Sequence, residues 1–80
     1  MNQVQVEYYA LFREQAGCNN EVLETPAATV GQLYEQLRTK HGFSLDANQL
    51  KVAVNEEFAE WSTEIKDGDS VVFIPPVAGG

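Results

Sequence analysis

The 80-residue sequence has few of the side chains on which metal, redox and nucleophilic chemistry depend. It holds one cysteine, Cys18, and one histidine, His41, so no internal disulfide can form. A plant-type iron–sulfur centre needs four cysteines and is excluded. The absence of a disulfide framework favours a reducing compartment, and we expect a cytoplasmic protein.

Positive charge is also scarce. The sequence contains five Lys and Arg residues and 12 Asp and Glu residues, which gives a net charge of −7 and makes nucleic acid an unexpected partner. The acidic charge either steers the protein toward a basic patch on a protein partner or mainly keeps a small domain in solution. The sequence contains no apolar run of about 18 residues and no basic-then-apolar leader, so we expect no membrane association.

The composition is nevertheless that of a folded domain, with 44% hydrophobic and 10% aromatic residues. The chain has room for one small core and for no large buried active site. We expect one domain over residues 1–74 and a flexible tail over residues 75–80.

Apolar periodicity predicts the strands. Residues 3–9 alternate and place Val4, Val6 and Tyr8 on one face, with Tyr9 on the other. Residues 21–24 and 51–54 are predicted to be short strands. Residues 55–57 form a turn after the second of these and lead into a weaker extended segment that carries Phe58 and Trp61, while the pattern of residues 61–65 is ambiguous. Residues 70–74 follow a turn at residues 66–69 and are apolar on both faces, which predicts a central strand.

Two helices are predicted. A short one over residues 10–16 ends at Gly17. The main helix begins at Thr29, for which Gln32 completes a capping box, and ends before Gly42. Its buried stripe consists of Val30, Leu33, Tyr34, Leu37 and His41. This order of elements favours an α+β roll of the ubiquitin type, the β-grasp, in which one main helix packs on one face of a mixed four- to five-stranded sheet.

The side chains offer little reactive chemistry. His41 lies at a helix end and is expected to be structural, and no base or positive group near Cys18 in the sequence activates that thiol. The carboxylates of the C-terminal half lack metal-loop spacing and are interpreted as a solvated acidic face: Glu56, Glu57, Glu60, Glu64, Asp67 and Asp69.

The remaining reactive group is the α-carboxylate of Gly80, which becomes reactive once it is activated, for example as an acyl-adenylate. Glycine leaves its carbonyl open to attack and passes through a narrow channel. A terminal diglycine is otherwise only a frayed end. The apolar strand and the stiff Pro75-Pro76 pair before it favour a functional tail that enters a partner.

Four segments resemble the small-subunit family of molybdopterin synthases: residues 8–14 (YYALFRE), 52–55 (VAVN), 67–69 (DGD) and above all 73–80 (FIPPVAGG). The resemblance covers essentially the whole chain and implies a β-grasp sulfur carrier. In that family a ubiquitin-activating-like adenylyltransferase uses ATP to adenylate the C-terminal glycine, here Gly80, which is converted to a thiocarboxylate. The thiocarboxylate enters the large synthase subunit and donates sulfur to cyclic pyranopterin monophosphate, which forms the dithiolene of molybdopterin.

The resemblance also implies the site. Gly80 carries the sulfur, Gly79 gives a slender passage, and the inserted arm consists of Pro75, Pro76, Val77 and Ala78. Tyr9, Phe58 and Ile74 are expected to form an apolar docking patch for both partners, with core packing as the alternative. Arg13 matches the family without an assigned role. The chain is expected to bind no cofactor or metal, to be inactive alone, and to form a heterotetramer with the large subunit. A carrier for another pathway such as thiamine synthesis, a protein modifier, and a plain interaction domain remain alternatives.

Overall fold

The computed structural model describes residues 1–76. The predicted tail residues Val77, Ala78, Gly79 and Gly80 lie outside the described part. The elements follow in the order β1 (Asn2–Tyr8), α1 (Leu11–Ala16), β2 (Asn20–Thr25), α2 (Val30–His41), the 3₁₀ turn η1 (Ala47–Gln49), β3 (Lys51–Val54), β4 (Glu57–Ala59) and β5 (Ser70–Ile74).

The strands form one mixed sheet in the order β2-β1-β5-β3-β4. The central strand β5 pairs parallel with β1, where Tyr8 lies opposite Phe73, and antiparallel with β3, where Lys51 lies opposite Ile74. The central position predicted for residues 70–74 is therefore confirmed. Its cause is the burial of Val71 and Phe73 on one face together with the partial burial of Val72 and Ile74 on the other.

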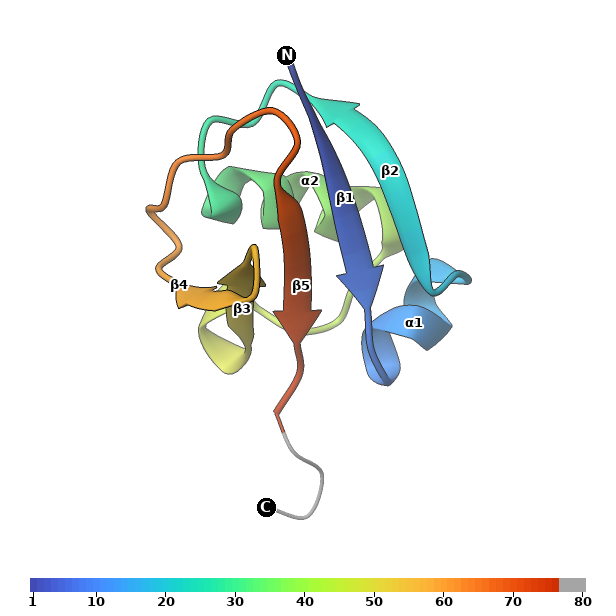
Figure 1. Ribbon diagram of the computed structural model, residues 1–80. Coiled ribbons are helices and arrows are strands. Elements are labelled where there is room, and N and C mark those ends of the chain that lie inside the picture. Colours follow the sequence, from blue (N-terminus) through green and yellow to red (C-terminus); the bar gives the residue numbers. More distant parts are fainter. Residues whose placement is uncertain (77–80) are drawn as a thin grey trace.

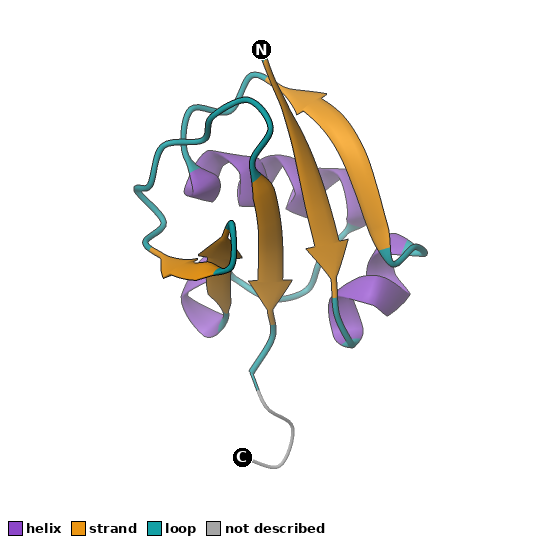
Figure 2. Ribbon diagram, viewed as in Figure 1, coloured by secondary structure: helices purple, strands orange, loops and turns teal. Residues whose placement is uncertain are grey.

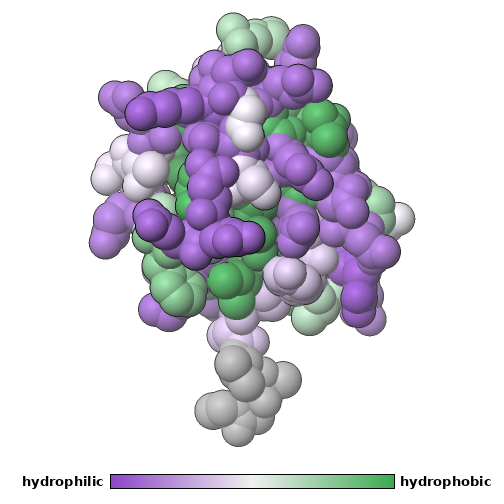
Figure 3. Space-filling view, viewed as in Figure 1, coloured by the Kyte–Doolittle hydropathy of each residue, from purple (hydrophilic) through white to green (hydrophobic). Residues whose placement is uncertain are grey.

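Helix α2 packs across one face of the sheet, behind β1 and β5 in Figure 1. Its stripe of Val30, Leu33, Tyr34 and Leu37 is fully buried against the inward residues of β1, which are Val4, Val6 and Tyr8. This one-helix arrangement on a five-stranded mixed sheet is the β-grasp roll that the element order predicted. The opposite face of the sheet, called the outer face below, is turned toward the viewer in Figures 1 to 3.

Aromatic rings fill the end of the core next to α1. Phe12 from α1 meets the rings of Tyr34, Phe43 and Phe73, with centroid separations between 5.0 and 6.5 Å. Phe43 folds back over the end of α2, as predicted, and Gly42 caps that helix with a φ of 73°. The hydroxyl of Tyr34 donates a hydrogen bond of 2.6 Å to the carbonyl of Leu45, so this buried phenol is satisfied.

The start of α2 differs in one detail from the predicted capping box. The Thr29 hydroxyl accepts from the backbone N–H of Gln32, as expected for an N-cap. The Gln32 side chain instead accepts from the N–H of Ala28, at 2.8 Å. Thr29 also forms an isolated antiparallel bridge with Glu64.

Two predictions for the C-terminal half are wrong. Asp69 is not part of a solvated face: it is buried and accepts hydrogen bonds from Asn55 Nδ2 at 3.0 Å and from the Lys66 N–H at 2.8 Å. Trp61 lies beyond the end of β4, in the irregular segment that Figure 2 shows between β4 and β5. Its indole is half-buried and stacks on Phe73 instead of extending an outer strand.

Within residues 1–76, no helix is long and apolar enough to cross a membrane.

Candidate functional site

The tail leaves the sheet at the end of its central strand. Strand β5 ends at Ile74, as the two following prolines predicted, and Pro75 is half-buried whereas Pro76 is exposed. Because hydrogen bonds hold β5 on both edges, the position from which the tail departs is fixed by the sheet. Figure 1 shows this departure at the end of the sheet where β1 also ends and α1 begins.

The three predicted docking residues lie on or beside the outer face. Phe58 is 76% exposed and Tyr9 is 50% exposed, which excludes core packing for both, while Ile74 is half-buried. The strand register places all three on the same side of the sheet. Ile74 follows the inward Phe73, and Tyr9 follows the inward Tyr8, which pairs with Phe73. Phe58 lies opposite Ala53 in the β3–β4 hairpin. All three therefore lie on or beside one face, with Tyr9 and Ile74 at the end of the sheet from which the tail departs and Phe58 level with Val72, two residues before Ile74. In Figure 3 the apolar surface of this face extends to the point where the chain leaves it.

The Tyr9 side chain is held by a local contact. Its hydroxyl donates to Glu7 Oε2 at 3.1 Å, and this hydrogen bond to a carboxylate raises the pKa of the phenol. The next residue, Ala10, has a φ of 49° and a ψ of −118° as the N-cap of α1. Glycine adopts such a conformation more readily than alanine, so the connection between Tyr9 and α1 is strained. No residue pattern in the sequence indicates this feature.

Pro75 and Pro76 form a ridge between two grooves that the sequence did not indicate. One groove of about 320 Å³ is lined by Ile74, both prolines and residues 48–51. The other, of about 360 Å³, is lined by the prolines with Ala10, Leu11, Glu14 and Leu45. A partner that receives the tail therefore meets concave surface on both sides of its root.

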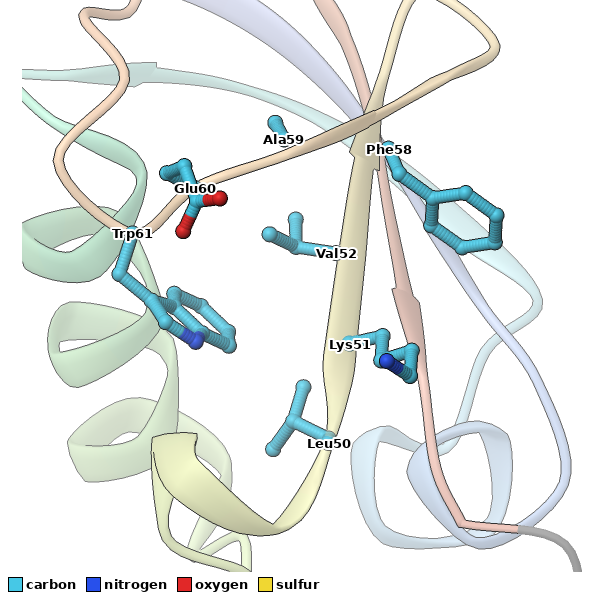
Figure 4. A pocket seen from close by; sticks show the side chains of 7 residues that line it. All are labelled: Leu50, Lys51, Val52, Phe58, Ala59, Glu60 and Trp61. Carbon is cyan, nitrogen blue, oxygen red and sulfur yellow. The ribbon is translucent and has the colours of Figure 1, made fainter.

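A third groove, of about 440 Å³, opens beneath the β3–β4 hairpin. Figure 4 shows Leu50, Val52 and Trp61 directed into it, whereas Lys51 and Phe58 at its rim point away, toward the outer face. The hairpin thus separates a groove on its inner side from the exposed Phe58 on its outer side.

The two remaining candidates, Cys18 and His41, meet at one carboxylate. Glu21 Oε1 lies 3.3 Å from His41 Nε2 and from Lys40 Nζ, and Glu21 Oε2 lies 3.9 Å from the half-buried Cys18 Sγ. The Tyr8 hydroxyl donates to the same carboxylate at 3.1 Å. These contacts tie the end of α2 to β2, which is the structural role expected for His41, and the carboxylate is the polar contact that the structure gives Cys18.

The charge of Glu21 is set by competing effects. Burial by itself raises the pKa of this carboxyl, but the hydrogen bonds from His41 and Tyr8 and the charge of Lys40 outweigh burial and lower it. For Tyr8, burial and the neighbouring Glu21 carboxylate raise the pKa far above its ordinary value, so the phenol stays protonated. In the part of the chain covered by residues 1–76, no cluster of three His, Cys, Asp or Glu side chains could hold a metal ion.

Comparison with known proteins gives a consistent picture. The model of the ThiS family matches residues 6–80. The molybdopterin synthase sulfur carrier subunit of Mycobacterium tuberculosis is 40% identical over 85 residues, which cover 100% of both chains. Among solved structures, SAMP1 from Haloferax volcanii is 25% identical with a TM-score of 0.82 and covers 99% of this chain and 100% of its own. A complex of subunits 1 and 2 of the molybdopterin-converting factor from Helicobacter pylori contains a chain that is 25% identical, with a TM-score of 0.68 and coverage of 98% and 99%.

Proposed function

The chain belongs to the ThiS family, and we propose that it is the sulfur-carrier subunit of a molybdopterin synthase. The observation that carries the proposal is the 40% sequence identity to the mycobacterial sulfur carrier subunit, which extends over the full length of both chains. The family match extends to Gly80, so the diglycine end lies within the matched region.

The proposed reacting group is the terminal carboxylate of Gly80. Attack of this carboxylate on the α-phosphate of ATP, in the active site of an activating enzyme, releases pyrophosphate and gives an acyl-adenylate. A persulfide then displaces AMP to give an acyl disulfide, and a thiol cleaves the sulfur–sulfur bond, which leaves a thiocarboxylate on Gly80 and a disulfide as the second product. Inside the large subunit, the sulfur attacks a side-chain carbon of cyclic pyranopterin monophosphate and displaces an oxygen substituent there. Water then cleaves the carbon–sulfur bond at Gly80, which regenerates the carboxylate, and two such transfers supply the two sulfur atoms of one dithiolene. Glycine suits each step because it leaves the carbonyl accessible.

The described residues support the delivery of such a tail. The central strand β5 fixes the tail root, and the exposed Phe58 and Tyr9 lie on or beside the same face of the sheet as Ile74. We propose that these three side chains form the docking surface for the large subunit and for the activating enzyme. Exposed aromatic residues beside a fixed departure point let a partner bind the domain and receive the tail together.

Mass spectrometry tests the sulfur-carrier role. We expect intact protein from cells that express the activating enzyme to include a form in which one terminal oxygen is replaced by sulfur. Fragmentation must locate the added mass in the C-terminal peptide, which distinguishes it from oxidation of Met1. Persistent absence of that form, even after incubation with the activating enzyme, ATP and a sulfur donor, would refute the proposal.

Deletion of Gly80 separates tail chemistry from folding. We expect this variant to lose sulfur transfer while its thermal unfolding stays close to that of the wild type, because residues 1–76 hold the core. Co-purification distinguishes this role from a carrier in another pathway or a protein modifier. The large synthase subunit should be captured by the wild-type chain, and a carrier of another pathway would not capture it.

A further inference from the structure

Lys51 occupies the strand between two of the docking residues. It is exposed on β3 and lies opposite Ile74 of β5, while Phe58 lies on β4, the other neighbour of β3. Figure 4 shows the Lys51 and Phe58 side chains on the same side of the hairpin, turned away from Leu50 and Val52. A partner that covers Ile74 and Phe58 therefore also covers the position of Lys51.

Lys51 is a cation without a carboxylate partner in the described part of the chain. The ion pairs between residues 1–76 use Arg38, Lys40 and His41, and none includes Lys51. Arg13 and Lys66 are likewise in none of these ion pairs, so what singles out Lys51 is its position between two docking residues. Burying an ammonium group under a partner is costly unless an acceptor compensates for its lost hydration.

We propose that Lys51 is a specificity-determining residue of the docking surface and that the large subunit places a carboxylate opposite it, within an apolar contact area. This inference rests on the proposed function and adds the chemistry of the partner face. It also reverses the expectation from net charge, because an acidic protein as a whole favours a basic partner surface. The partner face is locally acidic where it meets Lys51 and apolar where it meets Phe58 and Ile74.

Charge reversal tests the proposal through the sign of its effect. Lys51→Glu lowers the net charge from −7 to −9, because one positive charge becomes one negative charge. If the partner presents a carboxylate, the affinity for the purified large subunit falls by about tenfold or more. If the partner presents a basic surface there, the same substitution strengthens binding.

Lys66→Glu is the matched control, because it makes the same change in net charge at an exposed lysine. Lys66 precedes β5 by way of the turn at residues 66–69, so it lies at the end of β5 opposite to the tail root. We expect this variant to bind within about twofold of the wild type, since it lies outside the docking surface. Lys51→Met keeps most of the side-chain length, and we expect it to bind more weakly than the wild type and with less dependence on salt.

Isothermal titration of the full-length variants against the large subunit at low and high salt decides the outcome. Weaker binding of Lys51→Glu with unchanged binding of Lys66→Glu supports the proposal. Unchanged or tighter binding of Lys51→Glu, an equal loss in both variants, or an unchanged salt dependence of Lys51→Met overturns it. A different result would refute the proposed function itself: the wild-type chain would then not bind the large subunit at all.

Discussion

Replacing Phe58 by serine tests the docking surface most directly. A phenylalanine side chain has about 200 Å² of surface, and Phe58 is 76% exposed, so roughly 150 Å² is available for a partner to cover. At about 25 cal/mol per Å², covering this surface contributes at most roughly 4 kcal/mol to binding. Ordering of the interface offsets part of this gain, so we expect a loss of about 2–3 kcal/mol, or roughly 30- to 150-fold in affinity.

The stability of the domain should hardly respond to the same substitution. Phe58 contributes little to the core, and replacing an exposed strand residue changes the free energy of unfolding by about 1 kcal/mol or less. Thermal unfolding by circular dichroism checks this part, and calorimetric titration with the large subunit checks the affinity. A loss of affinity without unfolding is the combination expected of a docking residue.

Val22→Ser is the matched control for Phe58→Ser. Val22 is 60% exposed and lies opposite Gln5, so it belongs to the outer face, but it is on β2, at the other edge of the sheet from β4. Its replacement should leave the affinity within about twofold of the wild type. Wild-type affinity in Phe58→Ser, or an equal loss in Val22→Ser, would refute the assignment of the docking surface.

Three further predictions, one of them with a control variant, are tested by thermal or denaturant unfolding. Ala10→Gly relieves the positive φ of that residue and should stabilise the domain by about 1 kcal/mol, whereas Ala16→Gly, within helix α1, should destabilise it. Glu21→Gln should cost roughly 1–2 kcal/mol at neutral pH. Because contacts lower the pKa of Glu21, its contribution is complete above the ordinary value of 4.5 and is lost as the pH falls through the lowered pKa, so variant and wild type should converge in acid. Asp69→Ala leaves the Asn55 amide and the Lys66 N–H without their acceptor and should cost about 2 kcal/mol, which a failure to shift the unfolding midpoint would contradict.

Local patterns in the sequence were sufficient to predict the main elements. Alternation identified the inward residues Val4, Val6 and Tyr8, and the apolar character of residues 70–74 on both faces predicted the central strand. These predictions succeeded because burial by a sheet or a helix imposes a period that neighbouring residues must satisfy. The outward positions of Tyr9 and Phe58 were also within reach of the sequence, with the help of a family resemblance.

Contacts between distant residues explain what the sequence could not predict. Asp69 is buried because the Asn55 amide, 14 positions earlier, and the Lys66 N–H converge on its carboxylate. Trp61 turns inward, where its ring stacks on Phe73. Charge and hydropathy alone assign Asp69 to a solvated face and Trp61 to an extended segment. The positive φ of Ala10 has no sequence signature, because alanine is not a residue that marks such turns.

The position of the tail root follows from the same sheet that places the docking residues. Strand β5 is hydrogen-bonded on both edges, so Ile74 cannot shift relative to β1 and β3 without breaking a ladder. A partner that binds Phe58 and Ile74 therefore meets the start of the tail at a fixed place. The six residues that follow Ile74 span at most roughly 20 Å when extended. The distance from the docking surface to the chemistry is consequently limited by the length of the tail, and the depth of the receiving pocket must match it.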